Sequence, residues 1–239
     1  HLTAAFDGLY TMAYFGEDLR PYWNKDGKSS IEDLYADAEK DYKEVMAKCY
    51  AFDRQLMADA YLAGGKEYAE LCALAYRQSV SAFQMSSDGE LLYFTPQVGP
   101  VDEYYPASPL YLRYNPDLVK AMLNPFFYYS ESGKWGKPFP PHDLGGYPIV
   151  NGQTIGGDMP VEEAGNGLIM TAAIAKMEKN ASYAEKHWKT LTQWAEYLLE
   201  NGTDTGDQLT TDNFAGNCPH HANLSAKGVL GIAAGRNAE

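Results

Sequence analysis

The feature that most constrains the fold is a helical segment whose surface is apolar on every side. Residues 162–176 have a helix-like pattern, and within them the run GLIMTAAIA has nine consecutive uncharged residues. A helix that is apolar all round is buried on every side. The next segment, residues 183–199, carries a single apolar stripe and is expected to be half exposed. A buried helix followed by a half-exposed partner is typical of a ring of helical hairpins, so we expect an all-α fold, an α/α toroid of helical hairpins.

Further helical periods support this fold class. Apolar residues recur at steps of three and four after Ser29-Ser30, a pair typical of a helix N-cap. Gly64-Gly65 separates this helix from a second one at residues 66–83, which predicts an antiparallel pair joined by a short turn. With a short helix at 117–127 and a last one near the C-terminus, we expect six or seven helices. A closed ring of six hairpins needs about twice that number, so we expect residues 1–239 to be a single toroid domain, a fragment of a longer multidomain protein.

Two regions lack a helical pattern. Residues 1–24 are rich in aromatic side chains with glycine breaks, which predicts packed irregular structure. Residues 85–116 carry five prolines, and we find no helical period in them. The run LLYF within this region is compatible with a short strand, but the prolines that follow it exclude a continuous sheet.

The charge balance excludes several classes of partner. The chain has 32 acidic and 19 basic residues and a net charge of −13, which repels nucleic acid and anionic lipid surfaces. No apolar run is long enough to span a membrane. We therefore expect a globular protein without nucleic-acid partners.

The stretch from Trp135 to Met170 has the composition of a functional site, because proline and glycine turns hold polar side chains between an aromatic entry and an apolar exit. Within it, Glu162-Glu163 is the strongest candidate for acid–base chemistry. Neighbouring helix side chains diverge by about 100°, so one glutamate is expected to face a given cavity and the other to be structural.

A simpler explanation of the glutamate pair is that carboxylates at a helix start stabilise the helix dipole, by about 0.3–1 kcal/mol. We favour a functional role because other polar residues occupy similar junctions, and the starts of inner helices meet on one face of a toroid. These residues are Asp143, Asp158, Asn166 and Asp212. Two carboxylates in one cleft can divide into a proton donor and an ionised base.

No metal or cofactor site is predicted. The vicinal pair His220-His221 lacks a third ligand with telling spacing. The three cysteines show no C-x-x-C spacing, and neither G-x-S-x-G nor G-x-G-x-x-G occurs. The sequence therefore favours carboxylate chemistry without a cofactor.

Six long blocks resemble the central domain of the glutaminase A family, in the same order and over nearly the whole chain. They are FDGLYTMAYFGEDLRPYWN, GGKEYAELCALAYRQS, YPASPLYLRYNPDLVKAMLNPFFYYSESGKW, HDLGGYPIVNGQ, GGDMPVEEAGNGLIMTAAIA and LTTDNFAGNCPHHANLSAKGVLGIAA. The resemblance implies an all-α, six-hairpin glycosidase-like domain, usually preceded by a β-rich domain, in a secreted, periplasmic or cell-envelope protein. It also implies hydrolysis of L-glutamine to L-glutamate and ammonia, although many glycoside hydrolases share the fold.

The candidate carboxylates fit this resemblance. Those that match the family pattern are Asp143, Glu162, Glu163 and Asp212. Three neighbours depart from it, with Asn213 in place of an acid, Asn217 in place of a histidine and His221 in place of an asparagine.

Our leading hypothesis is a hydrolase of the glutaminase A type. Glu163 or Glu162 activates water, and Asp212 or Asp143 protonates the leaving nitrogen. The residues expected to bind or orient substrate are Tyr147, Asn166, His220, Trp135 and Asp158.

Two other functions stay open. A glycosidase acting on a polysaccharide would use Trp135, Tyr147 and Trp23 to stack on sugar rings, and a non-catalytic helical module would have no chemistry of its own. Aromatic side chains lining the cleft would favour sugar. A tight pocket with a cation or amide partner for an α-carboxylate would favour glutamine.

Overall fold

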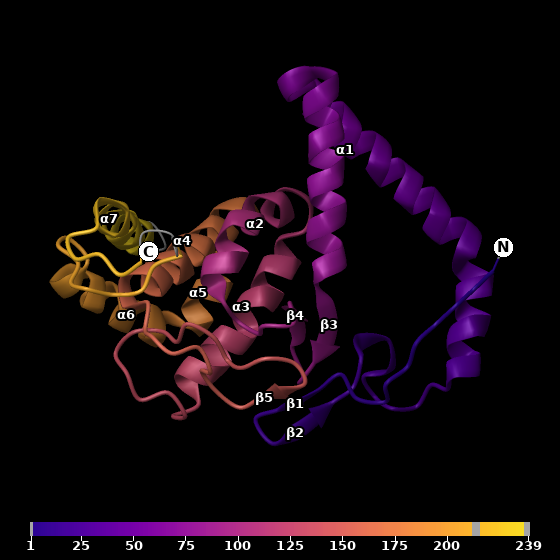
Figure 1. Cartoon of the computed structure of the whole chain (residues 1–239). Coiled ribbons are helices and arrows are strands. Elements are labelled where there is room, and N and C mark those ends of the chain that lie inside the picture. The colour runs from indigo at the N-terminus through magenta and orange to yellow at the C-terminus, as the bar shows by residue number, and fades with distance from the viewer. Residues whose placement is uncertain (1, 212–215, 237–239) are drawn as a thin grey trace.

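A computed structural model describes residues 2–211 and 216–236. Seven α-helices dominate it (Figure 1), which confirms the all-α, toroid-like fold. They are α1 Ile31–Ala82, α2 Val101–Tyr114, α3 Pro116–Glu131, α4 Pro160–Glu178, α5 Ser182–Lys186, α6 Trp188–Asn201 and α7 Ala222–Arg236. The strands are β1 Met12–Tyr14, β2 Glu17–Leu19, β3 Gln84–Ser87, β4 Leu91–Phe94 and β5 Ile149–Val150. Among the described helices, none is long and apolar enough to cross a membrane.

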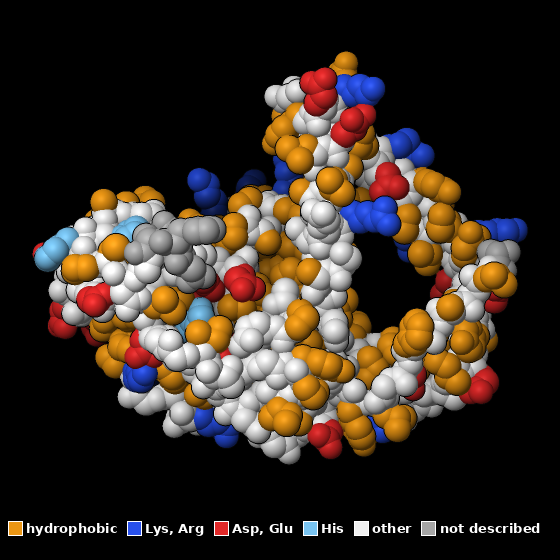
Figure 2. Space-filling view, in the orientation of Figure 1, with side chains coloured by type: hydrophobic (Ala, Val, Ile, Leu, Met, Phe, Trp, Pro, Cys, Tyr) orange, Lys and Arg blue, Asp and Glu red, His pale blue; other side chains and the backbone are white. Residues whose placement is uncertain are grey.

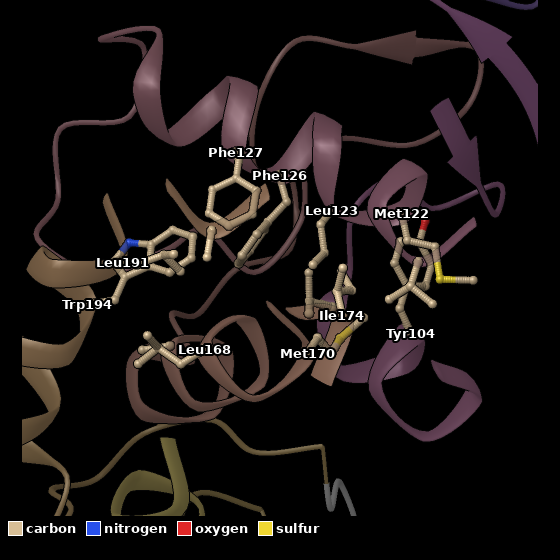
Figure 3. Close-up of a cluster of buried hydrophobic side chains, with 14 of the residues drawn as sticks. Tyr104, Met122, Leu123, Phe126, Phe127, Leu168, Met170, Ile174, Leu191 and Trp194 are labelled. Carbon is tan, nitrogen blue, oxygen red and sulfur yellow. The ribbon is translucent and has the colours of Figure 1, made fainter. Parts of the chain in front are cut away.

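The helix α4 lies at the centre of the helical body, in contact with α2, α3, α6 and α7. Its apolar side chains reach an aromatic core shared with α3 and α6 (Figure 3). Leu168, Met170 and Ile174 are at most 3% exposed, as an all-round apolar helix predicts. The next long helix, α6, buries one face through Leu191 and Trp194 and leaves the other in solvent, which agrees with the predicted inner and outer positions.

The long helix α1 contrasts with this packed body. It begins with a capping box, in which the Ser30 hydroxyl accepts from the Asp33 N–H and the Asp33 carboxylate accepts from the Ser30 N–H. It bends at Gly65, whose φ of 80° and ψ of −167° are not helical. The two arms meet through rings such as Phe52 and Tyr76, 4.8 Å apart, and then diverge into an open V (Figure 1).

Much of the apolar surface of α1 faces solvent, and Figure 2 shows hydrophobic side chains along both arms. Only Leu56, Ala60 and Ala69 of this 52-residue helix are buried. The predicted antiparallel pair is therefore present near Gly65, while the far ends of the arms stand apart.

The prediction that residues 85–116 contain no helix is wrong, because α2 forms in spite of Pro106 and Pro109. Proline inside a helix costs about 3 kcal/mol, since it removes one hydrogen bond and crowds the preceding turn. Val101, Tyr104 and Tyr111 recur at helical spacing and are at most 3% exposed. Each fully buried large apolar side chain contributes about 1.5–3 kcal/mol, so packing on α3 and α4 offsets the prolines.

Short strands hold the long loops in place. β1 pairs antiparallel with β2 and parallel with β5, and β3 pairs antiparallel with β4, which is the LLYF run. A second apolar cluster lies beneath these strands and includes Phe94, Leu144 and Val150. Leu144 and Val150 anchor the loop between α3 and α4 after residue 143, and Trp135 packs against the cluster before it.

Candidate functional site

Three buried polar side chains from separate segments meet where α2 and α4 begin. Asp102 lies in the first turn of α2, Glu163 in the first turn of α4, and His142 in the loop before β5. Their exposed fractions are 8%, 0% and 6%, respectively. One oxygen of each carboxylate and one imidazole nitrogen all lie within 4.8 Å of one another. We call these three residues the polar cluster.

Within the described part of the chain, two atoms of the polar cluster and one of the neighbouring Asn166 are unpaired. The Asp102 N–H donates to Glu163 Oε1 at 3.3 Å, and His142 Nε2 lies 3.9 Å from Asp102 Oδ1. Among the described residues, Asp102 Oδ1, His142 Nδ1 and Asn166 Oδ1 have no hydrogen-bond partner. A buried polar atom without a partner costs about 1–3 kcal/mol. Three such atoms in one place indicate a site built for something other than stability.

Asp143 fixes the loop that carries His142. Its carboxylate accepts hydrogen bonds from several donors at 2.9–3.0 Å, namely Gln97 Nε2, the Gly145 N–H, the Thr154 N–H and hydroxyl, and the Ile155 N–H. Its Oδ2 also lies 3.6 Å from His142 Nδ1. This geometry suits a role in orienting His142.

The surroundings of Glu163 disfavour its ionised form. Burial raises the pKa of Glu163 well above its ordinary value, and the charges of Asp102 and Glu162 raise it further. Hydrogen bonds from the Asn166 amide and the Asp102 N–H act in the opposite direction. The two hydrogen bonds to Glu163 therefore do not offset its burial and the nearby charges of Asp102 and Glu162.

The neighbouring Glu162 points to a different partner. Its Oε1 accepts a hydrogen bond from Lys227 of α7, and the two side chains are 3% and 14% exposed. The Lys227 ammonium also lies 4.7 Å from the centre of the Tyr105 ring. The two glutamates therefore diverge, as their adjacency on a helix predicts.

A pocket of about 200 Å³ opens beside this ion pair. It is lined by Asp102, Tyr105, Pro106, Glu162, Thr210, Thr211, Asn223 and Lys227. Thr211 donates its hydroxyl to Asp102 Oδ2 at 3.1 Å. The pocket therefore joins the start of α4 to the segment that precedes α7.

The other predicted site residues occupy different places. Asn166 lies one turn after Glu163, with its Nδ2 3.4 Å from Glu163 Oε2. Asp158 binds Lys137 at 2.6 Å beside a second hollow of about 350 Å³.

Three more candidates lie outside the pocket, among the residues that the structure describes. The Trp135 ring is covered by the Lys137 ammonium at 4.8 Å. Tyr147 is 49% exposed, and His220 pairs with Asp204 at the surface. Asp212 lies outside the described residues.

The sequence alone did not point to Asp102, His142 or Lys227. Asp102 starts the helix that was not predicted, so its junction position could not be recognised. His142 precedes Asp143 in the loop, but its neighbours in space, Asp102 and Glu163, are 40 and 21 positions away in the chain. The helix position of Lys227 was predictable, but its approach to Glu162 is a contact between α4 and α7.

Comparisons with known proteins agree with this architecture. Residues 65–237 match the family described as the glutaminase A six helical-hairpin domain, and residues 1–59 match a domain of unknown function (DUF5127). The boundary between the two matches falls next to the bend of α1 at Gly65.

Two fungal relatives are similar to the chain. Glutaminase A of Aspergillus oryzae is 34% identical over 81% of this chain and 30% of its own length. A protein of Arthroderma benhamiae named "Probable glutaminase" is 28% identical over 90% of this chain and 32% of its own length. The chain thus spans about a third of the curated relatives that it matches. The family match covers most of the chain, and the chain belongs to the glutaminase A six helical-hairpin family.

Proposed function

We propose that this site hydrolyses the side-chain amide of L-glutamine to give L-glutamate and ammonia. The observation that carries the proposal is the small pocket in which Asp102 and Glu162 lie beside the ammonium of Lys227. Family membership and the names of the two relatives favour a glutaminase-like hydrolase. The secreted, periplasmic or cell-envelope location and the preceding β-rich domain stay predictions from the resemblance.

The pocket suits a small zwitterion. The α-carboxylate of glutamine would bind Lys227, and its α-ammonium group would bind Glu162, so that two ion pairs replace the one between the side chains. A volume of about 200 Å³ is small beside the roughly 300–1,000 Å³ of sites for drug-sized ligands. A single amino acid fits this volume better than an oligosaccharide.

The polar cluster would supply the chemistry. A carboxylate of the Asp102–Glu163 pair takes a proton from water, and the resulting hydroxide adds to the amide carbon. The C–N bond then breaks as the nitrogen receives a proton, so that ammonia leaves and a carboxylic acid remains. Asp143 would act by orienting His142, since its own oxygens are already occupied by the loop.

A glycosidase is the second candidate, because paired carboxylates serve glycosidic bonds as well. The aromatic residues expected to stack on sugar are Trp135, Tyr147 and Trp23, and none of them lines the pocket beside Lys227. The Lys137 ammonium also lies over the Trp135 ring. The structure therefore favours the amide over the sugar. A non-catalytic helical module is the remaining alternative.

The test measures ammonia release from L-glutamine and reducing-sugar release from a panel of polysaccharides. We expect ammonia release, and we expect wild-type protein to prefer glutamine over 4-aminobutanamide, which lacks the α-carboxylate. Lys227→Met should raise KM for glutamine at least about tenfold, the loss of roughly 1.4 kcal/mol of binding. The same variant should largely remove the preference between the two amides.

The matched control is Lys176→Met, which removes an exposed lysine from the last turn of α4. It should leave KM and the preference for glutamine unchanged. Release of sugar without ammonia would identify a glycosidase, and no product in either assay would favour the non-catalytic module. If Lys227→Met hydrolysed glutamine with the KM and the amide preference of wild type, the result would contradict the proposed binding mode.

A further inference from the structure

The polar cluster has the ligand chemistry of a metal site. It places an imidazole nitrogen and two carboxylates from three separate segments within 4.8 Å of one another. Imidazole is a good ligand for Zn²⁺, and carboxylates also suit Mn²⁺. Three protein ligands with a further position for water are the usual arrangement of a catalytic zinc site.

One of the unpaired atoms, Asp102 Oδ1, faces another member of this cluster. Asp102 Oδ1 has no hydrogen-bond partner among the described residues, and His142 Nε2 lies 3.9 Å from it. Both side chains are 7% exposed. Two ligands about 2.1 Å from one ion at a tetrahedral angle lie roughly 3.4 Å apart. A cation between Asp102 Oδ1 and His142 Nε2 therefore requires only a small contraction.

Each of the three side chains has a polar neighbour. Asp143 Oδ2 lies 3.6 Å from His142 Nδ1, and its negative charge favours a proton on Nδ1, which leaves Nε2 available to an ion. The Thr211 hydroxyl donates to the far oxygen of Asp102, Oδ2, at 3.1 Å. The Asn166 amide lies 3.4 Å from Glu163 Oε2. Such outer partners are typical of metal ligands.

From this geometry we infer that Asp102, His142 and Glu163 bind one divalent cation, Zn²⁺ or Mn²⁺. The cation balances two buried carboxylates, whereas Lys227 already balances Glu162. A water bound to the ion is acidified by it, so the ion takes over the activation of water. The inference rests on the polar cluster alone and does not depend on glutamine as the substrate.

The experiment measures ion binding directly. Protein without a histidine tag is treated with a chelator, dialysed, and titrated with ZnCl2 or MnCl2 in a calorimeter, and metal content after dialysis is measured by mass spectrometry. We expect one equivalent of ion per chain and a rise in Tm when the ion is added. Asp102→Asn, His142→Gln and Glu163→Gln should each weaken binding at least about tenfold.

The control is His187→Gln, because His187 is, among the described residues, the other buried histidine with an unpaired ring nitrogen. It lies beside Glu131, outside the polar cluster, and its loss should leave ion affinity unchanged. Circular dichroism verifies that each variant is folded. Wild-type protein that binds neither ion overturns the inference, and so does binding that persists in all three cluster variants, because the ion then lies elsewhere. Ion binding without ammonia release would leave the inference intact and contradict only the proposed substrate.

Discussion

The first turn and the middle of α4 are both buried, but they lie in opposite surroundings. In the first turn, Glu162 and Glu163 are 2% and 0% exposed and face other charged groups. Farther along, Met170 and Ile174 are 1% and 0% exposed and lie in the core shown in Figure 3. Burial therefore does not distinguish function from packing. What distinguishes the first turn is buried charge beside polar atoms that have no partner.

The largest effect that we expect comes from Glu163→Gln. Activity should fall roughly 10³–10⁴-fold, which corresponds to about 4–5.5 kcal/mol in the barrier, because a carboxylate that handles water is lost. The free energy of unfolding of chelator-treated protein should stay equal or increase, since a neutral amide avoids burying a charge. Steady-state kinetics and urea unfolding measure the two quantities.

The control for this prediction is at the other end of the same helix. Glu178→Gln removes a carboxylate that binds Lys120, and activity should not change. If Glu163→Gln kept wild-type activity, or if Glu178→Gln lost as much, the functional distinction between the two ends of α4 would be wrong.

The core against which the apolar part of α4 packs should show the reverse behaviour. Trp194 of α6 is 2% exposed and stacks on Phe127 of α3 with ring centres 5.3 Å apart. Trp194→Ala should lower the free energy of unfolding by about 3–5 kcal/mol through lost burial and a cavity. Trp188→Ala, on the same helix but 37% exposed, should cost less than about 1 kcal/mol. If folded Trp194→Ala protein retains kcat, the result would support a core that serves stability and a first turn of α4 that serves activity. A loss of kcat without a loss of stability would contradict this division.

The contrast also explains which parts of the sequence were informative. The apolar half of α4 is predictable because GLIMTAAIA allows only burial, and the stripe on α6 is predictable from its period. The sequence pattern does not predict α2, because Pro106 and Pro109 lower the local helix propensity of this segment. The helix forms because its tyrosines are buried by tertiary packing. The period of α1 correctly predicts helix, but it does not say what covers the apolar face.

The site is predictable in the same partial way. Glu162, Glu163 and Asn166 lie where a loop enters a helix. Their spacing along that helix shows that the two glutamates diverge and that Asn166 lies on the same face as Glu163. The partners that give them chemistry, Asp102 and Lys227, come from α2 and α7, about 60 residues away on either side. Their approach depends on how helices pack, and no local pattern records it.

A smaller effect is expected where α4 is closest to its aromatic neighbours. A Cβ at Gly167 would lie 2.9 Å from Trp194 Cζ3 and 3.2 Å from Phe126 Cε1. Gly167→Ala should therefore destabilise by about 1–3 kcal/mol through overpacking, reduced by up to about 1 kcal/mol of helix propensity. The same change in a Trp194→Phe background should cost less, because the smaller ring leaves room.

Urea unfolding of the four proteins in this cycle measures the coupling between the two positions. Gly206→Ala is the control, since a Cβ at that position meets no atom within 4 Å. Additive effects of Gly167→Ala and Trp194→Phe would show that the two side chains do not compete for space.

The smallest effect concerns Glu131, whose ionised form is favoured by its surroundings, whereas that of Glu163 is disfavoured. Burial raises the pKa of Glu131, but hydrogen bonds from His187 and Thr190 outweigh it and hold the pKa below its usual value, with help from the Lys186 charge. A lowered pKa in the folded state adds stability that is present above the unfolded pKa and is lost as the pH falls through the folded pKa. Glu131→Gln should therefore be less stable than wild type at pH 7, and the difference should shrink as the pH falls below the ordinary glutamate pKa of about 4.3. Urea unfolding between pH 7 and pH 3 measures this difference, and a gap that stays constant over the range would show that Glu131 contributes by packing rather than by charge.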